Sequence, residues 1–173
     1  MSRSQPSGSG RREIAAYLRA SSPPLQTAIE AQRELLRHLK PLYARANRGQ
    51  AADAAERARA LGKRCGQLFR TQLERVEKLA PPPPAVRGDE YLRRWLRFLV
   101  LACEALTSAP PDGADTTYLG DCRDYVDDAR YAAKALSAIR QRLRDALVKA
   151  STGGAARPPR AAGRSAAAPR QPA

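Results

Sequence analysis

The segment DCRDYVDD, residues 121–128, is rich in aspartate. Asp121, Asp124 and Asp128 would share one face of a helix, because they are three and four residues apart. Carboxylate oxygens bind divalent cations, so this face is a candidate for a metal ion or a metal-bound diphosphate. Helical enzymes that work in this way need a second acidic motif, and the sequence has none. The pattern therefore favours a structural interpretation, in which acids in the first turns of a helix stabilise its positive end.

Three cysteines are the second candidate for a metal centre. Cys65, Cys103 and Cys122 fall on different predicted helices and lie at similar heights when counted from the connecting turns. Three thiolates at one level would suit zinc or copper(I). Each cysteine also takes a position in an apolar stripe that a small hydrophobic residue would fill. The single histidine, His38, is expected at another height. We therefore expect core thiols and no cofactor, with the cysteine site as the alternative.

Nucleophilic catalysis finds little support in the sequence. A Ser-His-Asp or Cys-His arrangement would have to centre on His38, which lies near Glu34 and Arg37 on a predicted helix. The Glu-x-x-His motif of di-iron bundles is absent, and so is a glycine-rich phosphate loop. We therefore expect a protein that is not an enzyme.

A run of basic residues is the strongest candidate for binding. It precedes the first turn between the long predicted helices and consists of Arg33, Arg37, Lys40, Arg45 and Arg48. Clustered cations hold phosphates through the release of counterions, without reading base sequence. The sequence shows no recognition helix, no aromatic platform for bases and no zinc finger. The competing interpretation is an ordinary solvated helix face.

The C-terminal segment is a second basic candidate. Its arginines, Arg157, Arg160, Arg164 and Arg170, are separated mainly by alanine, proline and glycine, and no acid accompanies them. Such a composition predicts disorder. So few charges would add only weak, salt-sensitive affinity for a polyanion. A tail that takes no part in binding is the alternative.

The whole chain is strongly basic. Its 173 residues include 31 lysines and arginines against 17 acids, a formal net charge of +14. Such a charge attracts nucleic acid, acidic membrane surfaces and acidic proteins. The excess of arginine, alanine and proline is also what a GC-rich bacterial genome produces without selection for binding. Charge alone therefore does not assign a function.

Cysteine usage and hydropathy indicate the compartment. Widely spaced cysteines without a CxxC pair favour a reducing cytoplasm over a disulfide framework. The first residues lack the apolar stretch of a secretory signal. The longest apolar run, FLVLACEAL, is too short to span a membrane, which takes about 20 residues. We expect a cytoplasmic protein with no membrane span.

Apolar residues recur at spacings of three and four along most of the chain, which predicts helices and no strands. A short helix is expected over residues 11–20, ended by the serines and prolines at 21–24. Long helices follow from about residue 25 to the turn at 47–50, and then over 51–79, 90–108 and 116–150. The apolar stripe of the first long helix is expected to comprise Leu25, Ile29, Gln32, Leu36, Leu39 and Tyr43.

Three local features bear on these helices. Pro41 should kink the first long helix or end it early, because proline removes a backbone hydrogen bond. Asp89 is expected to be the N-cap of the helix over 90–108. Gly62 and Gly66 weaken the helix over 51–79 by about 1 kcal/mol each, which indicates that another helix approaches closely there.

Amphipathic helices with short connections pack most simply up-down-up-down. The last helix is several turns longer than the one before it, so its surplus would stand uncovered. This surplus carries Ile139, Leu143 and Leu147. The short N-terminal helix lies at the same end and carries Ile14, Tyr17 and Leu18. We predict that it folds over the surplus and covers it, and a second copy of the chain is the alternative cover.

These observations predict an all-α, up-down-up-down four-helix bundle over residues 11–150, with a short extra N-terminal helix and disordered termini at 1–10 and 151–173. The expected function is that of a non-catalytic interaction protein. Its partner would be another protein or an acidic polymer, non-specific nucleic acid included. The alternative is a metal-binding or enzymatic bundle that uses the cysteines or the aspartate face. A monomer and a homodimer both fit the sequence.

Overall fold

The computed structural model describes residues 8–152, and nearly all of these residues are helical. The helices are α1 (Gly8–Ala20), α2 (Ser22–Ala46), α3 (Ala51–Glu77), α4 (Val86–Thr107) and α5 (Thr117–Thr152), with a short 3-10 helix, η1 (Pro83–Ala85), before α4. No strand occurs within residues 8–152. Residues 1–7 and 153–173, for which disorder was predicted, lie outside the described part of the chain.

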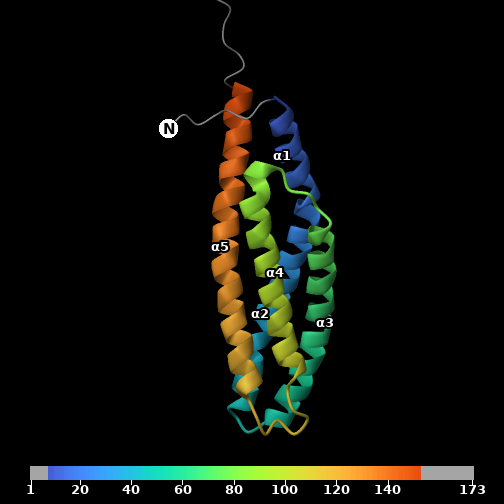
Figure 1. Ribbon diagram of the computed structural model, residues 1–173. Helices are drawn as coiled ribbons and strands as arrows, with labels where there is room; N and C mark the ends of the chain where they lie inside the picture. Colours follow the sequence, from blue (N-terminus) through green and yellow to red (C-terminus); the bar gives the residue numbers. More distant parts are fainter. Residues whose placement is uncertain (1–7, 153–173) are drawn as a thin grey trace, which may run out of the picture.

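Helices α2 to α5 form an antiparallel bundle (Figure 1). The turns after α2 and after α4 lie at one end of the bundle, and the proline-rich connection between α3 and α4 lies toward the other. The predicted all-α bundle is therefore confirmed.

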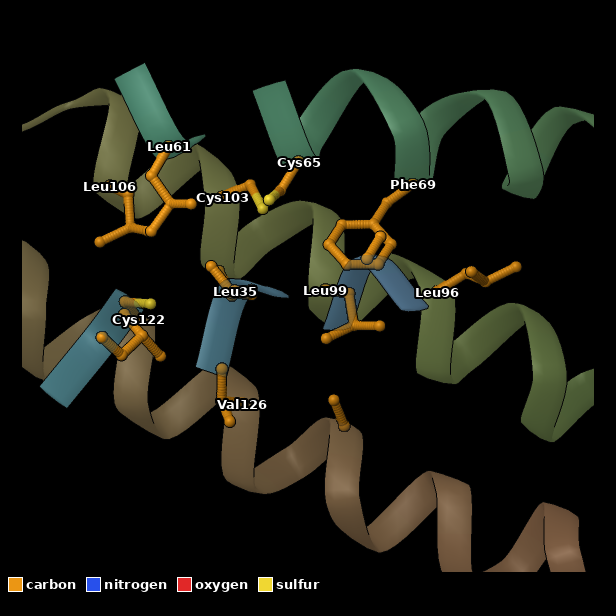
Figure 2. Packing of buried hydrophobic residues seen from close by; sticks show 14 of the residues in the cluster. Leu35, Leu61, Cys65, Phe69, Leu96, Leu99, Cys103, Leu106, Cys122 and Val126 are labelled. Atoms are coloured by element: carbon orange, nitrogen blue, oxygen red, sulfur yellow. The ribbon is translucent and has the colours of Figure 1, made fainter. Parts of the chain in front are cut away.

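The core of the bundle contains the large side chains that the apolar pattern assigned to it. Trp95 is 1% exposed, Leu99 is fully buried and Leu136 is 4% exposed. Phe69 of α3 and Leu99 and Leu96 of α4 lie in the same cluster (Figure 2). Burial of these residues holds the helices together through the hydrophobic effect.

The buried face of α2 differs from the predicted stripe by about one residue of rotation. The residues that α2 buries are Pro24, Ala28, Ala31, Leu35, Leu39 and Leu42. Of the predicted stripe, only Leu39 is fully buried, whereas Leu25, Ile29, Leu36 and Tyr43 pack at the edge of the core. Alanines at 28 and 31 explain the difference, because small side chains let α2 sit close to its neighbours while the longer ones flank the contact.

The predicted short helix is the start of a nearly continuous rod. Only Ser21 separates α1 from α2, and its amide donates to the carbonyl of Tyr17 at 2.9 Å. Pro23 and Pro24 lie in the first turn of α2 rather than in a loop. Proline is tolerated there, because those positions have no intrahelical partner for an N–H. α1 also begins at Gly8, earlier than predicted, so residues 8–10 are helical and not disordered.

The prediction that the N-terminal helix covers the surplus of the last helix is confirmed. A second hydrophobic cluster joins buried residues of α1, η1 and α5, namely Ile14, Tyr17, Leu18, Ala85 and Leu143. Ile139 and Leu147 of α5 pack against it and are partly buried. The helix does not fold back over the surplus, because α1 continues from α2 with no intervening loop (Figure 1).

Two local predictions need correction. Of the two outcomes expected at Pro41, an early end of the helix is wrong, because Pro41 is exposed and lies inside α2, which continues to Ala46. Asp89 is not the N-cap of α4, because the helix begins at Val86 and Ala85 takes the cap position. Asp89 is instead a buried residue of the first turn, and its partners are described below.

The close approach predicted at the α3 glycines is present. A β-carbon on Gly62 would lie 2.5 Å from the carbonyl oxygen of Cys103 and 2.7 Å from Oγ1 of Thr107. A β-carbon on Gly66 would lie 3.2 Å from Cβ of Cys103. Glycine at these positions therefore lets α3 and α4 pack backbone to backbone.

Candidate functional site

The predicted basic run divides into two groups. Arg33, Arg37 and Lys40 are exposed and share one face of α2, because they are four and three residues apart. Within residues 8–152, none of the three forms an ion pair or a side-chain hydrogen bond. Arg45 lies on the side of α2 that faces α3, and Arg48 is exposed in the turn that follows α2.

Two of the acids near this run are already paired. Asp53, in the first turn of α3, accepts from NH1 of Arg45 and from Nε of Arg57, both at 2.8 Å. These two contacts lower the pKa of Asp53, with the Arg57 hydrogen bond the larger cause. Glu34 of α2 pairs with Arg64 of α3 at 2.6 Å. Among the described residues, no ion pair reaches Arg33, Arg37 or Lys40, and the remaining acid of α2, the exposed Glu30, accepts from Nε2 of Gln26 at 2.9 Å.

The second basic candidate is the C-terminal segment. Arg157, Arg160, Arg164 and Arg170 lie outside the described residues.

The three cysteines are core residues on separate helices. Cys65 and Cys103 point toward each other across the contact of α3 with α4, and Cys122 lies apart on α5 (Figure 2). All three are free thiols and fully or almost fully buried. Burial raises the pKa of each thiol, in the case of Cys122 to about 12. Thiols that resist deprotonation are poor metal ligands and poor nucleophiles.

No metal centre assembles from the proposed ligands. Among the described residues, no three His, Cys, Asp or Glu side chains come together in a way that could hold a metal ion. In this part of the chain, neither the three cysteines nor the three aspartates therefore come together as a set of metal ligands. Asp121, Asp124 and Asp128 are exposed along the outside of α5, and His38 is exposed on α2.

A buried polar cluster that the sequence did not reveal ties α1 to α4. The hydroxyl of Tyr17 donates to Oδ1 of Asp89 at 2.9 Å, and Nε of Arg93 lies 2.6 Å from Oδ2 of the same carboxylate. Burial, followed by the hydrogen bond to Asp89, raises the pKa of Tyr17. Asp89 was assigned to a cap because it precedes an apolar run, and no local pattern pairs it with Tyr17.

A buried arginine closes the junction of α1 with α2. The NH1 group of Arg140 donates to Oγ of Ser21 at 2.8 Å, and its NH2 group donates to Oγ of Ser22 at 3.1 Å. The side chain is 5% exposed. Its position carried a signal, since Leu136, Arg140 and Leu143 follow the spacing of four and three that marks the buried stripe of α5. An arginine on such a stripe predicts a buried polar contact.

Comparisons of the chain with models of protein families, with curated proteins and with solved structures found no match. Within residues 8–152, no helix combines the length and the apolar character that crossing a bilayer requires. The fold and the surface together define a basic, antiparallel helical bundle.

Proposed function

We propose that the protein is a non-catalytic interaction module that binds an acidic polymer through the outer face of α2. One observation carries the proposal: Arg33, Arg37 and Lys40 form an exposed row without acidic partners on consecutive turns. In the first half of α5, by contrast, the exposed basic side chains Arg123 and Arg130 lie among aspartates, and Arg130 pairs with Asp127 at 2.7 Å. A row of unpaired cations at helical spacing suits a polymer with regularly repeated phosphates.

The proposal includes a cytoplasmic location and a partner without sequence specificity. Three free thiols are compatible with a reducing compartment. Nucleic acid is the acidic polymer that such a module would meet most often, and an acidic protein surface is the competing partner. Side chains that contact phosphates position a protein on nucleic acid but do not read its bases.

The test measures the affinity of the full chain for a short fluorescent duplex DNA by anisotropy over a range of salt concentrations. The variant Arg33→Gln, Arg37→Gln, Lys40→Gln loses three contacts. We expect the slope of log affinity against log salt to fall by about 2 to 3 relative to the unaltered chain. The control removes three exposed cations that are scattered along α5: Arg123→Gln, Lys134→Gln and Arg142→Gln.

Three results would count against the proposal. No binding by the unaltered chain at low salt removes the acidic polymer as partner and leaves an acidic protein as the candidate. An unchanged slope in the α2 variant removes this face from the interaction. An equal loss in the α5 control shows that net charge, and not the row on α2, is responsible.

A further variant in the same experiment tests the C-terminal arginines. Deleting residues 151–173 removes four positive charges and leaves the α2 face unaltered. If the tail contributes, the salt slope falls by a further amount that adds to the effect of the α2 variant. If the slope stays the same, binding belongs to the bundle alone.

A further inference from the structure

The contact between α2 and α5 is looser than the other contacts between neighbouring helices of the bundle, and we call it the α2–α5 seam. The backbones of α2 and α3, of α3 and α4, and of α4 and α5 come close at many points, whereas those of α2 and α5 do so at very few. Two cavities lie along this seam, and each takes side chains from both α2 and α5. The half-buried residues of α2 that line them include Leu25, Ile29, Leu36 and Tyr43.

Polar contacts hold the seam at both ends. At one end, the hydroxyl of Tyr43 donates to the carbonyl of Leu119 at 2.5 Å. At the other end, Arg140 donates to the hydroxyls of Ser21 and Ser22. α2 and α5 are therefore fixed relative to each other, and the space between them is part of the fold.

The cavity next to Arg140 has the composition of a ligand site. Its volume is about 290 Å³, at the lower end of the usual range for small-molecule pockets. The walls come from α2 and α5, and α4 contributes one residue, Trp95. The lining residues are Leu25, Ile29, Gln32, Trp95, Ala133, Leu136, Ser137, Arg140, Gln141 and Arg144. The wall therefore carries two arginines and no carboxylate.

Two buried donors in this lining have no partner. Nε1 of Trp95 and Nε of Arg140 are both inaccessible, and neither makes a hydrogen bond within the described residues. Trp95 is 1% exposed and Arg140 is 5% exposed. A buried N–H without an acceptor costs about 1 to 3 kcal/mol, so a ligand acceptor that reached one of these atoms through a small shift of the side chains around it would be stabilising.

The positive charge at this end of the cavity is also uncompensated. The hydrogen bonds of Arg140 go to two hydroxyls and to the carbonyl of Leu18, and none goes to a carboxylate. Burial and the neighbouring charge of Arg144 lower the pKa of Arg140. An anion near both guanidinium groups would relieve their repulsion, and the exposed guanidinium of Arg144 can bind a carboxylate in a planar, bidentate manner.

We propose that this cavity binds a small amphiphilic carboxylate, such as a medium-chain alkanoate. The carboxylate lies at Arg140 and Arg144, and the alkyl chain lies along Leu25, Ile29 and Leu136 against the ring of Trp95. The site is independent of the basic face on α2, because none of its lining residues belongs to that face.

The test uses the position of Trp95, which is the only tryptophan of the chain. The full chain is titrated with octanoate, and tryptophan fluorescence and calorimetry report binding. Octanamide is the matched uncharged probe. We expect octanoate to change the fluorescence saturably and octanamide to bind at least about tenfold more weakly, since a charged hydrogen bond is lost.

Two variants locate the site. Arg144→Gln alters an exposed side chain and should weaken octanoate binding about tenfold without changing the melting temperature. Ser137→Phe places a ring in the cavity from an exposed position and should abolish binding.

Equal affinity for octanoate and octanamide would overturn the proposal, because the arginines would then have no role. Unaltered binding by Ser137→Phe would place the ligand elsewhere. The absence of saturable binding by the unaltered chain would refute the site altogether.

Discussion

Replacing Gly62 by alanine tests the close packing of α3 against α4. The new β-carbon would lie 2.5 Å from the carbonyl oxygen of Cys103, 2.7 Å from Oγ1 of Thr107 and 3.0 Å from Cβ of Leu106. The Cys103 carbonyl is backbone and also accepts a hydrogen bond from Thr107 at 2.8 Å. α4 must therefore move as a unit, or this hydrogen bond must weaken.

The magnitude follows from two opposing effects. Overpacking against an immobile backbone costs about 3 kcal/mol, the upper part of the usual range. Alanine recovers about 1 kcal/mol through its better helix propensity. We expect Gly62→Ala to lower the free energy of unfolding by about 2 kcal/mol, which corresponds to a fall in melting temperature of about 4 to 8 °C.

Two other glycines provide matched controls in the same denaturation assay. Gly120 of α5 is exposed, and a β-carbon there would have no atom within 4 Å, so Gly120→Ala should gain about 1 kcal/mol. At Gly66 the nearest contact, Cβ of Cys103, is 3.2 Å away, and the two effects should nearly cancel. If Gly62→Ala proved as stable as Gly120→Ala, the close approach of α3 and α4 would be refuted.

Further predictions concern the buried thiols and the Tyr17 cluster. Cys65, Cys103 and Cys122 should resist a thiol reagent in the folded state and react fully in denaturant, and rapid native labelling would contradict their burial. The folded-state pKa of Cys122 is raised from 9.0 to about 12, so its contribution to stability is complete below pH 9 and is lost as the pH rises toward 12. The raised pKa of Tyr17 acts in the same direction above pH 10. Denaturant unfolding between pH 7 and 11 measures this loss, and Cys122→Ala should make it smaller, with the rest due to Cys65, Cys103 and Tyr17. An unchanged profile in Cys122→Ala would contradict the assignment. Tyr17→Phe should cost about 1.5 to 3 kcal/mol, because the buried carboxylate of Asp89 loses a donor, and an unaltered melting temperature would show that this hydrogen bond is not formed.

Local patterns were sufficient to predict most of the architecture. Apolar spacing located the long helices, and the glycines at 62 and 66 correctly indicated a close helix contact. The cover for Leu143 also followed from comparing helix lengths. These inferences succeed because each depends on residues that are near in sequence or on a comparison of helix lengths.

The failures concern information that is not local. Asp89 resembles an N-cap in sequence, and its burial depends on a tyrosine and an arginine from different parts of the fold. The prolines at 23 and 24 resemble a helix end, yet the first turn of a helix tolerates them equally well. The cysteines, in contrast, are core residues as expected, and they form no ligand set among the described residues because similar heights along a bundle do not fix which way a side chain points.

The rotation of α2 connects the fold to the proposed ligand site. Because Ala28, Ala31 and Leu35 face the core, the longer side chains of the predicted stripe are displaced toward α5. Long side chains keep the backbones of α2 and α5 apart, whereas Gly62 lets those of α3 and α4 come close. The space between α2 and α5 therefore stays open between the polar contacts at its two ends. Trp95 and Arg140, each with one buried donor that has no partner, line the cavity that remains there. The same rotation places Arg33, Arg37 and Lys40 opposite the core, which leaves α2 with a cationic outer face and one side along the cavity.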